Sequence, residues 1–188
     1  SSANTAEMVS FTRIIVRTVD LEISVADVSS SVEDIAEISK SFGGWTVSSK
    51  KNEGHSGQIS IRVPVDSLGE VLGAIRKLAS NVELEIVRSE DVTDEYVDTE
   101  ARLKNFEATE KALIRLFESA LSIEDTLAVQ KELTKIQGDI ESLQGTIKLL
   151  ERTAAYSLVN VVLRLVPIDM PVDAGEDKSA SVNEIVRF

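Results

Sequence analysis

The chain has 188 residues, enough for one well-packed core with an extension, and it carries a formal net charge of −12. That charge argues against nucleic acid as a partner, because neutralising phosphates requires clustered Lys and Arg. The lack of cysteine excludes disulfides, thiolate metal sites and cysteine nucleophiles, and there is no run of about 18 apolar residues that would predict a membrane span.

The chain opens with a strand pattern followed by a helix pattern. Apolar residues at alternate positions in the range 11–25 predict a long first strand, with a change of face near Val19 and Asp20 that indicates a bulge. Asp27 or Ser29 is suited to cap the helix that follows, because a short polar side chain there accepts a hydrogen bond from the first turn.

Two glycines end this helix and a β-hairpin follows it. Gly43 and Gly44 predict a left-handed helix terminus. Strands over 45–50 and 58–63 flank a turn with two further glycines, which is typical of a hairpin with a longer loop. Trp45 at the start of the first of these strands is predicted to pack in the core or to form a half-exposed anchor.

A short helix and a fourth strand complete the first part of the chain. Pro64 stops the preceding strand, and Asp66 or Ser67 begins a helix that runs to Leu78. A strand follows over 81–92, with apolar side chains (Val82, Leu84, Ile86) predicted on one face and acids (Glu83, Glu85) on the other. The order β-α-β-β-α-β predicts an α+β fold with a ferredoxin-like antiparallel sheet and two helices on one face.

Residues 98–155 predict two long helices joined by a short break, in the form of an antiparallel coiled-coil hairpin. The second helix carries an a/d heptad seam, whose apolar residues step alternately by four and three positions. Its members are Val129, Leu133, Ile136, Ile140, Leu143, Ile147 and Leu150. The first helix offers a matching seam of Leu103, Phe106, Leu113, Phe117 and Ala120, with Glu110 as its polar member. Ser122 and Asp125 resemble a capping box that opens the second helix. These seams suit both a hairpin folded on itself and one exchanged with a second molecule.

A final apolar strand over 156–166 predicts that the hairpin is an insertion before the last strand of a base domain. The base then comprises 11–97 and 156–166, and the hairpin comprises 98–155. The remaining range, 167–188, is rich in Pro, Asp and Gly near its start and predicts a linker or juxtamembrane tail.

Several segments of the chain form a specific combination. The main one is 89–105, SEDVTDEYVDTEARLKN, which lies where the long helices begin. The others are Gly43-Gly44, 61–64 (IRVP), 122–127 (SIEDTL) and Glu132-Leu133. Together these segments resemble a bacterial family known as a domain of unknown function, DUF4349. The resemblance runs from about Arg13 to Leu165. It implies an extracytoplasmic domain anchored to the membrane by an N-terminal signal or lipoprotein sequence and often a C-terminal membrane helix, segments absent from this chain. It supplies no catalytic residues.

The acidic cluster at the junction of the fourth strand and the long helices is the one candidate metal site. Asp91, Asp94 and Asp98 are suited to bind Ca²⁺ only if at least six oxygens converge. In the simpler interpretation Asp98 or Thr99 caps the long helix, and the other acids complement its dipole or are solvated. Asp98 and Arg102, spaced i to i+4, are also predicted to form a clamp that joins sheet to hairpin.

Two further features bear on function. His55, the only histidine, falls in the hairpin loop, where an exposed polar residue is ordinary and no partner for general-base catalysis is evident. Gly138 and Gly145 are seven residues apart on the predicted outer face of the second long helix, and are either tolerated weak points or a flat strip where another chain packs.

The function predicted from these observations is that of a non-enzymatic, membrane-anchored extracytoplasmic module. Its helical hairpin would contact a protein partner or a second copy, and no cofactor is expected. The alternative is an envelope domain that senses a ligand or Ca²⁺ at the acidic junction.

Overall fold

A computed structural model of the protein describes residues 13–52 and 55–166. Over these residues the chain forms β1 (Ile15–Val25), α1 (Val28–Ser41), β2 (Trp45–Asn52), β3 (Ser56–Pro64), a 3-10 turn (Val65–Ser67), α2 (Leu68–Leu78), β4 (Asn81–Asp91), α3 (Thr93–Ser119), α4 (Ile123–Ala155) and β5 (Tyr156–Leu165). The predicted tail, 167–188, lies outside the described residues.

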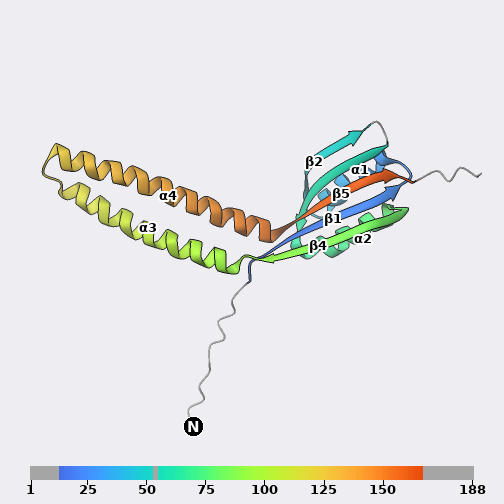
Figure 1. The fold of residues 1–188 in the computed structure, drawn as a ribbon, viewed down its shortest axis with the longest axis horizontal. Coiled ribbons are helices and arrows are strands. Elements are labelled where there is room, and N and C mark those ends of the chain that lie inside the picture. Colours follow the sequence, from blue (N-terminus) through green and yellow to red (C-terminus); the bar gives the residue numbers. More distant parts are fainter. Residues whose placement is uncertain (1–12, 53–54, 167–188) are drawn as a thin grey trace, which may run out of the picture.

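The described strands form one mixed sheet of five, in the order β2-β3-β5-β1-β4. β1 and β5 run parallel, and the other neighbouring pairs are antiparallel. Helices α1 and α2 lie on one face of the sheet, and the long helices α3 and α4 project together from one end (Figure 1). The predicted α+β class is therefore confirmed. The sheet differs from a four-stranded ferredoxin-like sheet because the returning strand β5 lies between β1 and β3.

The core lies between the sheet and helices α1 and α2, because each contributes one apolar face. The buried side chains are those of Val19, Leu21, Ile23, Val25, Val28, Val32, Ile35, Ile59, Ile61, Val63, Leu68, Val71, Leu72, Ile75, Val159, Val161 and Leu163. Burial alternates along β3 and β5, as expected for strands with one covered face.

The bulge in the β1–β4 pair is not at the predicted position. The pairing of β1 with β4 is regular through Val19 and Asp20, and the buried apolar side chains alternate from Val19 to Val25, so the face does not change there. The register shifts instead between Glu22 and Ile23, which pair with Leu84 and Val82 and leave Glu83 as an extra residue in β4. The prediction that Val82, Leu84 and Ile86 share one face was therefore wrong. Val82 packs against the core, whereas Leu84 and Ile86 are 42% and 37% exposed.

The open face of the sheet carries a row of hydrogen-bonded polar side chains that crosses four strands. Ser60 Oγ donates to Asn160 Oδ1 at 2.8 Å, and Asn160 Nδ2 donates to Asp20 Oδ1 at 2.9 Å. Arg88 of β4 completes the row by donating to the other oxygen of Asp20. The row therefore links β3, β5, β1 and β4 on the side that no described helix covers.

The ends of α1 follow the sequence signals in part. Asp27 caps the helix, because its Oδ1 accepts a hydrogen bond of 2.7 Å from the backbone N–H of Ser30. Gly43 has φ +76° and provides the left-handed terminus. Gly44 does not adopt that conformation; it is required by close approach, since a Cβ there would lie 2.2 Å from the carbonyl oxygen of Arg62.

Candidate functional site

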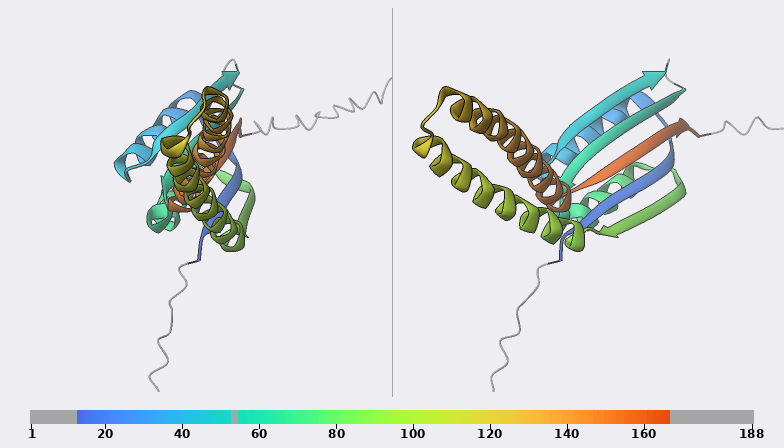
Figure 2. Two further views of the ribbon diagram at one scale, coloured as in Figure 1. Left: turned by 90° about the vertical axis from the view of Figure 1, so that its left-hand side faces the viewer. Right: turned by 60° about the vertical axis from the view of Figure 1, so that its left-hand side comes forward.

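The helical hairpin is formed by two helices of unequal length that pack antiparallel along their apolar seams (Figure 2). With 27 and 33 residues, α3 and α4 are roughly 40 and 50 Å long at 1.5 Å per residue. Every predicted seam residue of α4 is buried or partly buried. On α3, the polar member Glu110 is also partly buried, and it accepts a hydrogen bond of 3.1 Å from Gln137 Nε2 across the seam.

The turn between the two helices is set by Ser122, as the sequence predicted. Ser122 Oγ accepts from the backbone N–H of Asp125 at 3.0 Å and donates to Asp125 Oδ2 at 2.6 Å. The first residue of α4 therefore follows directly after Ser122, and the connection to α3 is only three residues long (120–122).

Gly138 and Gly145 lie on the outward face of α4. Both are exposed, and a Cβ added at either would meet no described atom within 4 Å. Their predicted outward position is confirmed, and their role as an interaction strip stays a prediction.

The tip of the hairpin carries exposed apolar side chains, a feature that the sequence analysis missed. Leu121 is fully exposed, Ile123 is 81% exposed and Leu127 is 65% exposed. Beside them is a hollow of about 350 Å³ between the end of α3 and the start of α4. Its lining residues are Leu116, Ser119, Ala120, Leu121, Asp125 and Val129. The sequence does contain one signal of this exposed tip: Ile123 and Leu127 are spaced i to i+4 on one side of the helix but fall outside the heptad seam.

The junction of β4 and α3 differs from its prediction. Helix α3 begins at Thr93, so Asp98 and Thr99 lie inside the helix and neither caps it. Asp91 holds the first turn instead, because Thr93 donates to Asp91 Oδ1 through its hydroxyl at 2.5 Å and its backbone N–H at 3.1 Å. These hydrogen bonds lower the pKa of the Asp91 carboxyl, with a smaller contribution from the positive charge of Arg13.

The candidate metal ligands are only partly brought together. Asp91 and Asp94 line a hollow of about 420 Å³ with Arg13 and Thr93, whereas Asp98 is not among its lining residues. Across residues 13–52 and 55–166, no three His, Cys, Asp or Glu side chains are grouped so as to hold a metal ion.

The predicted clamp between Asp98 and Arg102 is not formed. Both side chains are exposed on α3, and the ion pairs among the described residues do not include this pair. The two helices are tied near the base by Tyr96, whose hydroxyl donates to Glu151 Oε1 at 3.0 Å. That hydrogen bond is the main cause of the raised pKa of Tyr96. Helix α3 is also joined to the start of the sheet, since Ile14 N–H donates to Thr93 Oγ1 at 2.9 Å.

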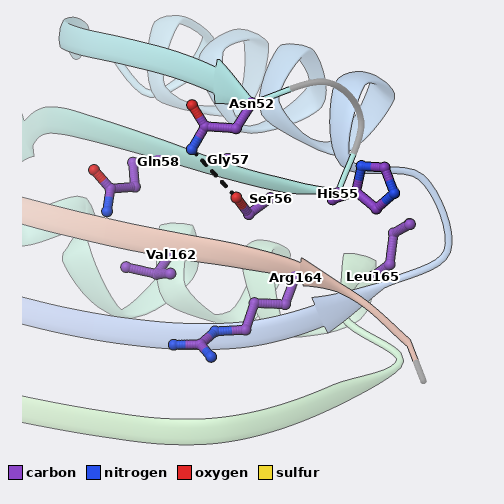
Figure 3. A pocket seen from close by; sticks show the side chains of 8 residues that line it. All are labelled: Asn52, His55, Ser56, Gly57, Gln58, Val162, Arg164 and Leu165. Atoms are coloured by element: carbon purple, nitrogen blue, oxygen red, sulfur yellow. Dashed lines mark hydrogen bonds between the residues drawn. The ribbon is translucent and has the colours of Figure 1, made fainter.

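His55 lies at the opposite end of the base from the hairpin, beside a shallow hollow of about 350 Å³ (Figure 3). The lining residues come from the β2–β3 turn and from the end of β5, among them Asn52, Arg164 and Leu165. Asn52 Nδ2 donates to Ser56 Oγ at 3.3 Å, and Arg164 approaches Glu22 of β1 at 3.6 Å. His55 is exposed in this turn, as the sequence predicted.

Trp45 is 42% exposed and forms a half-exposed anchor, one of the two predicted alternatives. Its ring packs against that of Tyr156 with 4.8 Å between centroids and a tilt of 58°. Arg62 on the neighbouring strand donates to the carbonyl oxygen of Tyr156 at 3.0 Å. The aromatic pair therefore joins edge strand β2 to the start of β5, close to the hairpin.

Together these features define a mixed α+β domain with a projecting helical hairpin. The chain belongs to a family described as a domain of unknown function (DUF4349), whose family model matches residues 13–184. Comparison with curated proteins and with solved structures finds no match. None of the helices in the described part of the chain combines the length and hydrophobicity of a membrane-spanning segment.

Proposed function

We propose that this chain is a non-enzymatic extracytoplasmic module, anchored to the membrane by flanking segments, that uses its helical hairpin to contact a protein partner or a second copy. The observation that carries the proposal is the hairpin itself. It projects from one end of the base, and most of its surface outside the seam is exposed (Figures 1 and 2). Long exposed helices suit recognition by another protein surface.

The arrangement of the base supports this use of the hairpin. The end of β5 and the tip of the hairpin lie at opposite ends of the described part of the molecule (Figure 1). The tip is therefore far from the end of β5, and its residues are exposed to other molecules. The base would hold the hairpin rigidly, because α3 follows β4 and α4 leads directly into β5.

We also propose the finer description of the fold. With β5 set aside, the strand order is β2-β3-β1-β4, which supports a ferredoxin-like unit opened by the returning strand. The alternating four- and three-residue spacing of the α4 seam supports an antiparallel coiled coil.

Localisation is tested on the full-length gene product in its own host. Cells are fractionated, and intact cells or spheroplasts are treated with external protease. Membrane association with a cleavable domain is the expected result. A soluble protein that the protease does not reach would contradict the anchored, extracytoplasmic proposal.

The contact role of the hairpin is tested by photo-crosslinking from single positions on α3 and α4 in the same cells, with positions on α1 as controls. Crosslinks that arise from the hairpin and not from α1 are expected. Crosslinks from α1 alone would contradict the role of the hairpin.

A second candidate function, sensing of a ligand or Ca²⁺ at the acidic junction, is favoured by the hollow that Asp91 and Asp94 line. Calorimetric titration of the chain with Ca²⁺ tests it. Saturable binding that is lost in Asp91→Asn would support this function, and the absence of heat in wild-type protein would remove Ca²⁺ as its ligand.

A further inference from the structure

Exposed apolar side chains on the hairpin are concentrated at its tip. The tip patch comprises Ile114, Leu116, Phe117, Leu121, Ile123 and Leu127, all from the last turns of α3, the connection and the first two turns of α4. On the rest of the described hairpin, large apolar side chains with comparable exposure are Val97 and Leu149, both near the base. Exposed apolar groups gathered in one place indicate a contact surface, whereas single scattered ones are ordinary.

The tip patch contains both a projection and a recess. Ile123 and Leu127 are one helical turn apart and project from the same side of α4. Beside them lies the hollow between α3 and α4, which is lined by Leu116, Ser119, Ala120, Leu121, Asp125 and Val129. A surface that carries a projection and a matching recess can pair with an identical surface about a two-fold axis, because each copy supplies what the other accepts.

The charge distribution also favours a second copy. The whole chain carries −12, but the tip segment 111–132 carries −1. This segment has three basic and four acidic residues: Lys111, Arg115, Lys131, Glu118, Glu124, Asp125 and Glu132. When two tips meet, the base domain of each molecule stays about one hairpin length from the contact, far beyond the screening length of about 8–10 Å at physiological salt. Electrostatic repulsion between the two negatively charged molecules is therefore small in this arrangement.

We propose that two copies of this chain associate tip to tip, with Ile123 and Leu127 of each copy inserted into the hollow between α3 and α4 of the other. The inference rests on the proposed function and deepens it by naming the partner and the part of the hairpin that binds. Two turns of each helix form an interface smaller than the roughly 800 Å² per partner of a stable complex, so the dimer is weak and depends on concentration.

Sedimentation equilibrium of the full 188-residue chain tests the association. The weight-average mass is expected to rise from that of a monomer towards that of a dimer as the concentration increases. Leu127→Glu is expected to keep the mass monomeric over the same range, because it places a charge in the recess. Leu149→Glu is the matched control: Leu149 is 49% exposed but lies near the base of the hairpin, away from the tip, so this variant is expected to behave as wild type. Circular dichroism of each variant checks that the helices are retained.

Crosslinking of single-cysteine variants tests the geometry, which is straightforward because these 188 residues include no cysteine. With a short bifunctional maleimide, Ile123→Cys is expected to give dimers and Gly138→Cys is not. Dimers from Gly138→Cys alone would overturn the proposal in favour of lateral packing along α4.

Three other results would also overturn it. A chain that stays monomeric but floats with phosphatidylcholine–phosphatidylglycerol vesicles, and loses flotation in Leu127→Glu, would identify the tip as a lipid contact. A chain that is monomeric while the hairpin crosslinks to a different protein in cells would refute self-association and leave the proposed function standing. A monomer with no crosslink from the hairpin would refute both.

Discussion

Gly44 lies where the end of α1 meets β3, and its surroundings leave no room for a side chain. A Cβ there would approach Arg62 O at 2.2 Å and Ser39 Oγ at 2.8 Å. Gly44→Ala is expected to lower the free energy of unfolding by about 2 kcal/mol or more, because the backbone of β3 must shift. A Cβ added at Gly73 on α2 would meet nothing within 4 Å, so Gly73→Ala is expected to raise the free energy of unfolding by up to about 1 kcal/mol. Urea unfolding measures both, and equal midpoints for Gly44→Ala and wild type would contradict the close approach.

The ion pair of Arg76 with Glu85 predicts a pH-dependent contribution to stability. Arg76 donates to both carboxylate oxygens, at 2.9 Å and 2.5 Å, and these hydrogen bonds lower the pKa of Glu85. A lowered pKa contributes stability above the unfolded value of about 4.3, and this stability is lost as pH falls through the folded value. Because both side chains are partly exposed, Glu85→Gln is expected to lose no more than about 1 kcal/mol at pH 7.

Measurements of Glu85→Gln at acidic pH provide the control for this prediction. Below the folded-state pKa of Glu85 both proteins carry a neutral side chain at this position, so their unfolding free energies are expected to converge. Urea midpoints of the two proteins between neutral and strongly acidic pH measure this convergence. A difference that stays constant with pH would show that the effect comes from packing and not from charge.

Tyr96 and Asp98 distinguish the observed tie between the long helices from the predicted one. Tyr96→Phe removes the hydrogen bond to Glu151 and is expected to lower stability by about 0.5–1 kcal/mol. Asp98→Asn is expected to leave the melting temperature unchanged, because Asp98 is exposed and forms no ion pair with Arg102 in the described structure. The melting temperatures of both variants, measured by thermal unfolding, distinguish the two ties. A lower melting temperature in Asp98→Asn alone would support the predicted ion pair between Asp98 and Arg102.

At the scale of the elements, the seam of the hairpin predicts a local loss of stability. Leu143 is 9% exposed between α3 and α4, and Leu143→Ala is expected to cost about 2–3 kcal/mol. Since these helices pack mainly on each other, the loss should appear as faster hydrogen exchange in α3 and α4, with β1 and β5 unchanged. Leu149→Ala, at a half-exposed position of the same helix, is expected to change little. Equal acceleration in β1 would mean that hairpin and base unfold as one unit.

The elements that were predicted well are those with a long, regular period. The heptad spacing identified α4 and its buried side, and the capping signature of Ser122 marked its start correctly. The start of α3 was placed five residues late because Asp98 matches a cap signature, whereas the actual N-cap residue, Val92, has no capping side chain. The reversed faces of β4 depend on one extra residue, Glu83, which a two-residue alternation does not reveal.

The candidate site was predictable only in part, for a related reason. The outward position of Gly138 and Gly145 follows from helical period alone. The apolar tip depends on which side chains remain uncovered once two helices have packed, so it requires the tertiary structure. In the same way, the buried alternation of β5 is compatible with any central strand, and its position between β1 and β3 depends on where the hairpin returns.

At the scale of the whole molecule, the long hairpin connects two points of the sheet that lie close together, the end of β4 and the start of β5. β4 is antiparallel to β1, and β5 is parallel to it on its other side. The end of β4 and the start of β5 therefore lie at the same end of the sheet, two strand spacings or roughly 10 Å apart (Figure 1). Residues 93–155 connect these points by an excursion of about 50 Å, so the geometry of the base does not require the hairpin.

This geometry predicts opposite outcomes for two deletions. Replacing residues 97–152 with a Gly/Ser loop of about six residues, which is long enough to span the gap, is expected to give a base that unfolds cooperatively. A chain truncated after residue 97 is expected not to fold, because losing β5 leaves β1 and β3 without their shared neighbour. Circular dichroism and urea unfolding of both proteins measure the difference. If the truncated chain folds, β5 is dispensable for the base, and if the looped chain does not fold, the base depends on the hairpin as well as on β5.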